Sequence, residues 1–440
     1  MTSDAMESRP PSPSLPGTKP AGGGAGFWAF LVTLFLGAFN DNVSKLVIMA
    51  YGTSMLEPES PQASLFLSLG GMVFILPYLL FSSAAGLLAD RHSKKWVMVW
   101  TKAWEVVVML LGFLTAYAGN AYLMLVVLFG MGAQSAFFSP AKYGFLPETQ
   151  PAERLSQANG ATQMWTFLAI ILGGWGGGAL SHAVGEENLP MGMLACVGIA
   201  ILGTITSFAI TPSPLGNKGT PFRIPDPITP HLKTLFRDAR RDNPVLLASI
   251  LGNSLFWLLG TMAQLVMLLL AKNTLKVDDQ VMGLLQAAMG VGIGAGCFLA
   301  GLLIRQERPF RLVPAGGILL GGSLLAMGLL GDRLPWAFCL VVLAGFSSGL
   351  YMLPLTTAIQ RLSPPAERGR YLAASSASDC AGMIFGSGAL GLLGLLKFSP
   401  LGVLRSMALL ALLPLPWLCR VLFRKGGPGR GEDATGRTPM

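Results

Sequence analysis

Long apolar stretches alternate with short polar connections along the whole chain. A helix of roughly 20 apolar residues spans a ~30 Å hydrocarbon layer, and about twelve stretches of this kind can be counted. The pattern therefore predicts an all-α integral membrane protein with about twelve transmembrane helices. The expected helices begin near Phe27, Ser64, Trp96, Ala121, Leu155, Pro190, Pro244, Val281, Leu312, Trp336, Tyr371 and Leu401.

The composition supports a membrane protein and disfavours several other classes. Only 12% of the residues are charged and 52% are hydrophobic, whereas about a quarter of a soluble domain is charged. The net charge of +9 comes from lysines and arginines in short loops, so we expect no nucleic-acid partner. The five cysteines form no CxxC pair, and we expect no metal and no cofactor.

The basic residues also predict the orientation in the membrane. One set of alternate loops carries most of the lysines and arginines, beginning with Arg91, Lys94 and Lys95, and the other set carries few. By the positive-inside rule the basic loops are cytoplasmic, which places both termini there. Residues 1–26 are rich in Pro, Ser and Gly and are expected to be a disordered cytoplasmic tail. They lack the pattern of a signal peptide.

A long basic loop and an internal repeat divide the chain into two halves. The loop at 211–243 separates six helices at 27–210 from six at 244–423, and a tail follows at 424–440. "SPAKYGFLPETQPAER" at 139–154 and "LPLTTAIQRLSPPAER" at 353–368 share a proline and the ending P-A-E-R at an offset of 214 residues. We therefore predict two six-helix pseudo-repeats joined by a cytoplasmic linker.

This organisation, with "GLLADRHSKK" at 86–95 between the second and third helices, resembles the major facilitator superfamily. The resemblance implies that Gly86 allows a close approach and that Asp90 meets a helix end or an arginine across the halves. Arg91 would stay on the cytoplasmic side. The sequence departs from the usual motif at Ser93 and Lys94.

Four further motifs resemble the lysophospholipid transporter family within that superfamily: "FLGAFNDN", "FFSPAKYGFLPE", "LSQANG" and "GNSLFWLLG". The resemblance implies a flippase of the bacterial inner membrane that moves lysophospholipids, such as lysophosphatidylethanolamine, from the outer to the inner leaflet for reacylation. Some relatives carry a fused acyltransferase with an HxxxxD motif. None of the three histidines here has an aspartate five residues on, so the expected acyltransferase partner is a separate cytoplasmic protein.

The stretch "FLGAFNDNVSK" at 35–45 places buried polarity in the first helix. Counted from Phe27, Asp41 lies ~21 Å along the helix axis and thus near or somewhat beyond the midplane. Lys45 is one turn further on the same face, and Asn40 and Asn42 flank the aspartate. Asp41 could receive a substrate ammonium while Lys45 holds a phosphate. Alternatively, Asp41 and Lys45 form a structural ion pair.

Other polar residues are candidates for the substrate path. Lys142, near the cytoplasmic end of the fourth helix, could bind a phosphate or simply extend to the interface. Asn253, Trp257, Gly260 and Gln264 share one face of the seventh helix, and Asp379 lies on the eleventh. The family resemblance implies an arginine where this chain has Gln264. Lys102 and Glu105 are interpreted as a structural pair near the cytoplasmic face.

The glycine clusters "GGWGGG" at 173–178 and "GVGIGAG" at 290–296 follow no strand, so a nucleotide site is disfavoured. They indicate close helix packing or walls that part to leave an acyl chain in the bilayer.

Three other functional classes remain to be compared with lipid transport. A proton-coupled exporter of drugs or small solutes could use Asp41 or Asp379 as its proton carrier. Charges in both halves argue against a scaffold without transport. An enzyme is least favoured, because no nucleophile and base occur at a recognisable spacing.

The charge bias gives a topology that reporter fusions can check. Fusions after Pro58 and Glu187 should report the periplasmic side, whereas fusions after Lys218 and Arg424 should report the cytoplasmic side, because basic loops remain inside. Alkaline phosphatase and green fluorescent protein activities in intact cells measure this. An odd number of spans between Lys218 and Arg424 would contradict the arrangement of six plus six helices.

Overall fold

The computed structural model describes residues 24–54, 61–185, 188–213, 236–237, 239–241, 243–304 and 310–425. Within them it has 12 helices long and apolar enough to cross a membrane, which confirms the expected all-α architecture. Most of the expected tails and linker, at 1–23, 214–235 and 426–440, lies outside the described residues.

The first half contains six long helices: α1 (Ala25–Ser54), α2 (Pro61–Arg91), α3 (Lys94–Tyr117), α4 (Ala121–Thr149), α5 (Leu155–Val184) and α6 (Leu189–Phe208). The second half contains α8 (Pro244–Leu269) continued by η2 (Leu270–Leu275), α9 (Asp279–Leu303), α10 (Leu312–Leu330), α11 (Leu334–Leu362), η3 (Pro365–Glu367) with α12 (Arg368–Leu395), and α13 (Pro400–Leu412) with α14 (Leu415–Lys425).

Side-chain caps fix where several of these helices begin. The Asn243 side chain accepts a hydrogen bond from the backbone of Leu246, and Asp278 does the same for Val281. Such caps satisfy amide groups that a helix leaves free at its first turn. Pro244 follows Asn243 at the start of α8, where a missing N–H has no consequence. Local sequence therefore sets these boundaries.

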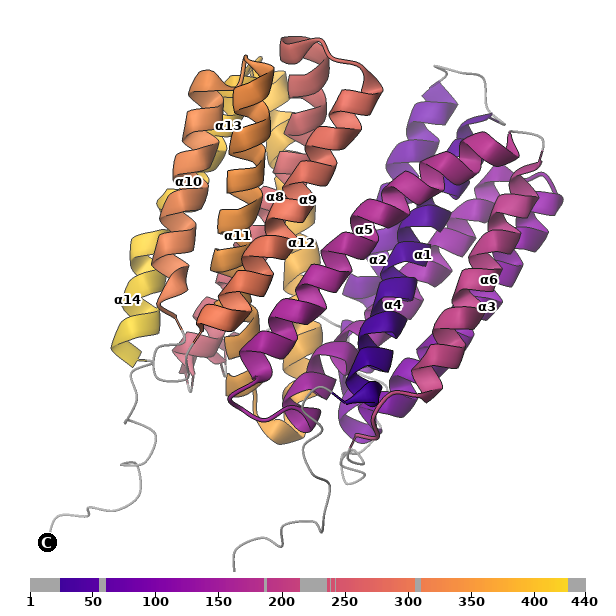
Figure 1. Ribbon diagram of the computed structural model, residues 1–440, viewed down its shortest axis with the longest axis horizontal. Helices are drawn as coiled ribbons and strands as arrows, with labels where there is room; N and C mark the ends of the chain where they lie inside the picture. Colours follow the sequence, from indigo (N-terminus) through magenta and orange to yellow (C-terminus); the bar gives the residue numbers. More distant parts are fainter. Residues whose placement is uncertain are drawn as a thin grey trace, which may run out of the picture.

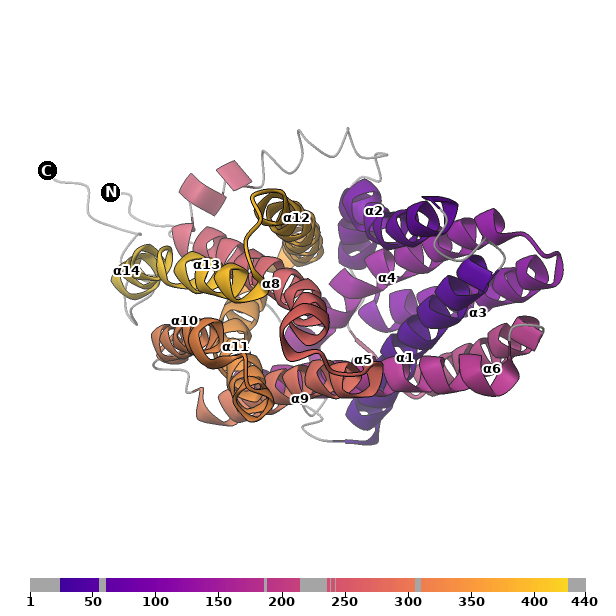
Figure 2. The ribbon, with the colours of Figure 1, turned by 90° about the horizontal axis from the view of Figure 1, so that it is seen from above.

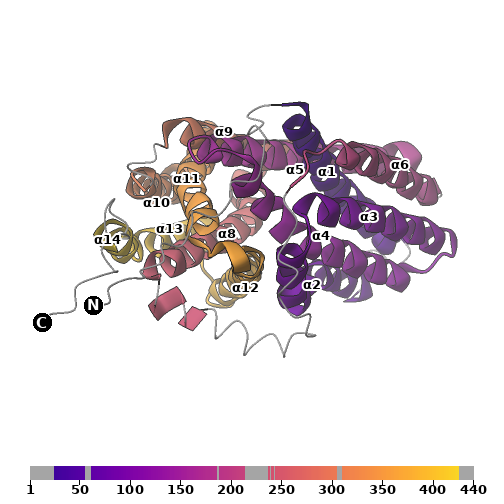
Figure 3. The same cartoon turned by 90° about the horizontal axis from the view of Figure 1, so that it is seen from below.

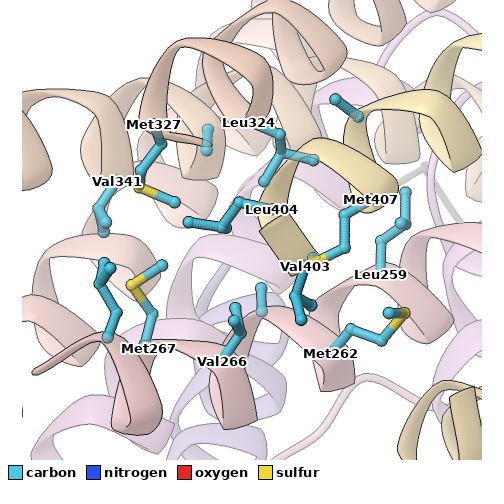
Figure 4. Close-up of a cluster of buried hydrophobic side chains, with 14 of the residues drawn as sticks. Leu259, Met262, Val266, Met267, Leu324, Met327, Val341, Val403, Leu404 and Met407 are labelled. Atoms are coloured by element: carbon cyan, nitrogen blue, oxygen red, sulfur yellow. The ribbon is translucent and has the colours of Figure 1, made fainter. Parts of the chain in front are cut away.

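Each half is a bundle with its own apolar interior. Figure 2 shows the first half on one side and the second half on the other, with α5 beside α9 along one seam and α2 beside α12 along the other. One cluster in the second half packs Met262 and Val266 of α8 against Leu404 and Met407 of α13, with α10 above them and α11 to one side (Figure 4). Leucine and methionine fill this space without leaving a polar group unpaired.

The two halves meet at one end of the molecule. We call this the basic end and define it as the end at which α2 finishes with Arg91 and α3 starts with Lys94. Figure 1 shows the halves close together there and diverging towards the opposite end. Viewed from the basic end (Figure 3), α12 lies against α2 and α4, while α9 lies against α5. The structure is therefore a state closed at the basic end.

Glycines allow the close approach along both seams. A Cβ on Gly301 of α9 would lie 2.8 Å from the carbonyl oxygen of Ser156, and one on Gly160 of α5 would lie 2.8 Å from that of Cys297. On the other seam a Cβ on Gly86 would lie 2.7 Å from Cα of Arg370. Small residues of this kind let membrane helices pack backbone to backbone.

Enlarging Gly301 should hold the basic end open. Gly301→Val would overpack the α5–α9 seam, and overpacking costs ~1–3 kcal/mol, equivalent to a decrease of at least about fivefold in the closed population. Cys297, which is 0% exposed one turn away, should then react about tenfold faster with a maleimide in a variant whose other cysteines are replaced by alanine. Gly322→Val is the control, because a Cβ there meets nothing within 4 Å. An unchanged rate would contradict this account of the seam.

Candidate functional site

Asp41 of α1 faces α4 and has an incomplete set of partners. The Ser135 hydroxyl donates a hydrogen bond to Asp41 Oδ2 at 2.9 Å. The other oxygen, Oδ1, is buried and has no donor among the described residues. A buried acceptor without a donor is costly, more so when it is charged. An ammonium group or a proton would satisfy it.

Asn40 turns away from Asp41 into a buried network with α3. Its Nδ2 donates to Glu105 Oε1 at 2.8 Å, and its side chain is 0% exposed. Glu105 also forms an ion pair with Lys102, as the sequence suggested for these two residues. Asn40, expected as a substrate contact, thus lies behind the site, and we propose that it supports Asp41 rather than touching a ligand.

Lys45 and Asn42 lie to either side of Asp41 and make separate contacts. The Lys45 ammonium lies 4.5 Å from the centre of the Phe74 ring, and among described residues it makes no ion pair within 4 Å with Asp41. The structural ion pair that the sequence allowed is therefore not formed in this state. Asn42 donates to the Ala38 carbonyl of its own helix on the side that faces α5, beside Gly173.

Lys142 is a buried cation without an acidic partner in the described part of the chain. Its side chain is 8% exposed, its Nζ donates to Thr166 Oγ1 at 3.3 Å, and it lies 4.8 Å from the centre of the Tyr143 ring. Because an ammonium can donate three hydrogen bonds, capacity remains for an anion. Pro140 lies within α4 without ending it, so Lys142 projects from a continuous helix.

Asp379 in the second half is, by contrast, surrounded by donors. Asn253 Nδ2 donates to both carboxylate oxygens at 3.0 and 2.9 Å, and the Ser254 hydroxyl donates to Oδ1 at 3.1 Å. Thr356 in turn donates to Asn253 Oδ1. This arrangement stabilises a carboxylate without a counterion, and it occupies Asn253 with Asp379.

The other residues of the polar stripe expected on the seventh helix, now α8, have fewer contacts than Asn253. Trp257 packs edge to face against Phe256 with ring centres 5.4 Å apart. A Cβ on Gly260 would meet nothing within 4 Å, and Gln264 is exposed. Asn253 is thus bound to Asp379, whereas the other three residues of the stripe, Trp257, Gly260 and Gln264, remain available for contact with a substrate in the proposal below.

The motif at 86–95 lies between the halves at the basic end. Asp90 accepts hydrogen bonds from the backbone N–H groups of Gly369 and Arg370, at 2.5 and 3.1 Å. These groups belong to the first turn of α12, whose positive dipole end attracts a carboxylate. The structure thus places Asp90 at a helix end, and Gly86 gives the space for it; Arg91 ends α2 beside them.

A second set of contacts across the halves lies nearby. Asn159 and Gln360 donate to each other through their side-chain amides, at 2.7 and 2.8 Å. Arg361 donates to the Ala152 carbonyl at 2.6 Å. Because Ala152 belongs to one P-A-E-R segment and Arg361 lies shortly before the other, the repeated segments help to join the halves.

The glycine clusters serve mainly as packing surfaces in this state. A Cβ on Gly173 or Gly177 of α5 would approach the α1 backbone, and one on Gly292 or Gly296 of α9 would approach α11. These contacts lie inside each half. Gly290 and Gly294 of α9, by contrast, face Ile171 and Met164 of α5 across the halves, so parting walls remain a proposal for these two glycines.

Several partners of the site could not be found by sequence reasoning. Ser135, Gln134 and Thr166 are common polar residues, and only the packing of α1, α3, α4 and α5 brings them to Asp41, Glu105 and Lys142. Glu105 did carry a signal, because an acidic residue in a transmembrane segment is rare.

Comparisons with known proteins identify the family. The model of the Major Facilitator Superfamily matches residues 23–387. The lysophospholipid transporter LplT of Cronobacter sakazakii is 31% identical over 348 residues, which cover 78% of this chain and 81% of the relative. LplT of Escherichia coli O157:H7 is 30% identical over 349 residues, with coverage of 78% and 81%. The chain belongs to the lysophospholipid transporter family of the major facilitator superfamily.

Solved structures share the fold of this family member. The fucose transporter FucP in its outward conformation has a TM-score of 0.73 at 14% identity, covering 90% of this chain and 98% of that one. A bacterial homologue of the iron transporter ferroportin, in an outward-facing state, has a TM-score of 0.69 at 15% identity, covering 91% and 99%. At such identities the likeness concerns the fold alone. The protein is thus a multi-pass membrane transporter.

The different surroundings of the two half-buried aspartates predict different effects on the stability of this transporter. Asp379→Asn should lower the free energy of unfolding by about 2 kcal/mol, because Asn253 and Ser254 lose a charged acceptor. Asp41→Asn should change it by less than about 0.5 kcal/mol, because only one neutral donor is affected. Denaturant unfolding of the purified protein in detergent measures both, with Asp332→Asn at the exposed α10–α11 turn as control. Equal losses at Asp41 and Asp379 would refute the contrast.

Proposed function

We propose that this protein is a flippase of the bacterial inner membrane that moves lysophospholipids, such as lysophosphatidylethanolamine, from the outer to the inner leaflet. A separate cytoplasmic acyltransferase would then reacylate them. The proposal rests first on the relatives named lysophospholipid transporter. The observation within the molecule that carries it is a pair of charges with too few partners: the half-buried Asp41, whose Oδ1 atom is buried without a donor among the described residues, and the buried Lys142.

The chemistry of the substrate accounts for these charges. The single acyl chain of a lysophospholipid is soluble in the hydrocarbon layer, but its zwitterionic head is not. An ammonium needs an acceptor, which Asp41 Oδ1 can supply, and a phosphate needs a cation, which Lys142 can supply. The proposed site therefore offers one group of each sign without a counterion of its own.

The positions of the two charges suggest a route for the head. Lys142 lies seven residues beyond Ser135 on α4, which is ~10 Å nearer to the basic end along the helix axis. With the basic end cytoplasmic, the direction from Asp41 to Lys142 is the direction in which the head would travel. Lys45 over Phe74, with Trp257 and Gln264 of the second half, would line the earlier part of the route.

Alternating access supplies the movement. The halves are joined at the basic end through Asp90 and the Asn159–Gln360 pair and diverge at the other end (Figure 1). Rocking of one half against the other would break these contacts and open the basic end. The acyl chain can stay in the bilayer throughout, so only the polar head needs the interior of the protein.

Uptake by reconstituted protein tests the proposal. Vesicles that contain the purified transporter should take up labelled lysophosphatidylethanolamine, and Asp41→Asn should reduce the rate at least about tenfold, because a hydrogen bond to a charged group contributes ~1.5–3 kcal/mol. Asp332→Asn, an exposed acidic residue neutralised in the same way, should transport at the normal rate. Uptake measured with and without Na⁺ and H⁺ gradients would also identify any coupling ion.

A deletion strain separates lipid transport from the exporter alternative. Cells without the gene should leave exogenous lysophosphatidylethanolamine unconverted to diacyl lipid, even when the cytoplasmic acyltransferase is supplied. If they reacylate it normally and instead become sensitive to dyes or antibiotics, the protein is an exporter and the lipid proposal is wrong.

A further inference from the structure

The buried ion pair of Lys102 and Glu105 on α3 lies next to the first helix and has no role in the route described above. Both side chains are 2% exposed. Bringing two charges out of water costs free energy that their attraction often does not recover, so such a pair is weak grounds for stability. A pair placed beside the substrate site suggests a functional use.

The hydrogen bonds of the pair hold the Lys102 ammonium on Glu105. Glu105 Oε2 accepts from Lys102 Nζ and from Gln134 Nε2 at 3.4 Å, while Oε1 accepts from Asn40 Nδ2 at 2.8 Å. Both carboxylate oxygens are thus satisfied by residues of three helices. The cation is fixed to this carboxylate rather than shared with others.

A glycine in the first helix reserves the place of the ammonium. A Cβ on Gly37 would lie only 2.0 Å from Lys102 Nζ, and the next atoms it would meet are also in Lys102 and Glu105. No larger residue fits at position 37 without moving the cation. The ammonium lies 5.1 Å from the centre of the Phe138 ring, which adds a favourable contact.

Asp41 is the neighbouring acidic group, and it is within electrostatic range of Lys102, Glu105 and Lys45. It is also linked to the pair by hydrogen bonds. The Ser135 hydroxyl is 2.9 Å from Asp41 Oδ2 and 3.0 Å from Gln134 Oε1, and Gln134 reaches Glu105. Because Lys102 is paired with Glu105, its ammonium does not donate to Asp41, whose Oδ1 stays without a donor among the described residues.

We propose that Glu105 is a positioning residue whose task is to hold Lys102 away from Asp41, so that Asp41 can accept the ammonium of a lipid head group. This inference rests on the proposed function and extends it to head-group selection. Without Glu105 the free Lys102 ammonium turns to Asp41 and occupies the place of the substrate. When Lys102 and Glu105 are both neutralised, no ammonium of the protein competes with the substrate for Asp41.

The test compares three variants of the purified transporter in vesicles: Glu105→Gln, the double variant Lys102→Met with Glu105→Gln, and Gly37→Ala. The probes are lysophosphatidylethanolamine, which has an amine, and lysophosphatidylglycerol, which has none. Glu105→Gln should raise KM for the ethanolamine lipid at least about tenfold with kcat within about twofold, and should change KM for the glycerol lipid by less than about twofold. The double variant should recover to within about threefold of the wild type.

Gly37→Ala, which keeps every charge but displaces the ammonium, should shift KM in the same selective way to a smaller extent. Size-exclusion profiles and unfolding temperatures show whether each variant is folded. If Glu105→Gln does not fold, Gly37→Ala provides the test in its place. Equal changes for both lipids, or failure of the double variant to recover, would overturn the inference while leaving the proposed function intact. A wild-type protein that carries neither lipid would instead overturn the proposed function and the inference with it.

Discussion

A charge inside a hydrocarbon layer must find a partner, and this requirement organises the interior of the protein. The charges on the described helices fall into three groups. Lys102 and Glu105 neutralise each other. Asp379 is surrounded by neutral donors from α8. Asp41 and Lys142 are left with too few partners, and a group left this way inside a membrane protein is suited to a ligand that brings the missing charge.

The same requirement shapes the contacts between the halves. Apolar packing distinguishes little between protein and lipid, so helices associate through small residues and hydrogen bonds. The basic end uses both, with glycines such as Gly86 and Gly301 at the seams and polar contacts such as the Asn159–Gln360 amide pair. Contacts of this kind can be made and broken without exposing a large apolar surface, as alternating access requires.

The halves differ in chemistry at positions that the sequence repeat relates. The offset of 214 residues that relates the P-A-E-R segments pairs Lys142 with Thr356. Lys142 is a cation with unused donors, whereas Thr356 donates to Asn253 and so supports Asp379. Positions related by this offset thus differ in chemistry, and the two charges with too few partners among the described residues, Asp41 and Lys142, both lie in the first half.

The sequence by itself determined the number of helices, their approximate starts and the family, because hydrophobic length and local motifs depend only on neighbouring residues. It also singled out Asp41, Lys142 and Asp379, because charges are conspicuous in apolar segments. Only the tertiary structure decided their different situations: Asn253 and Ser254 reach Asp379, Ser135 reaches one oxygen of Asp41, and Asn40 turns to Glu105. Hydrogen-bond partners of this kind are separated by 65 to 126 residues along the chain, so they depend on how the helices pack rather than on any local pattern.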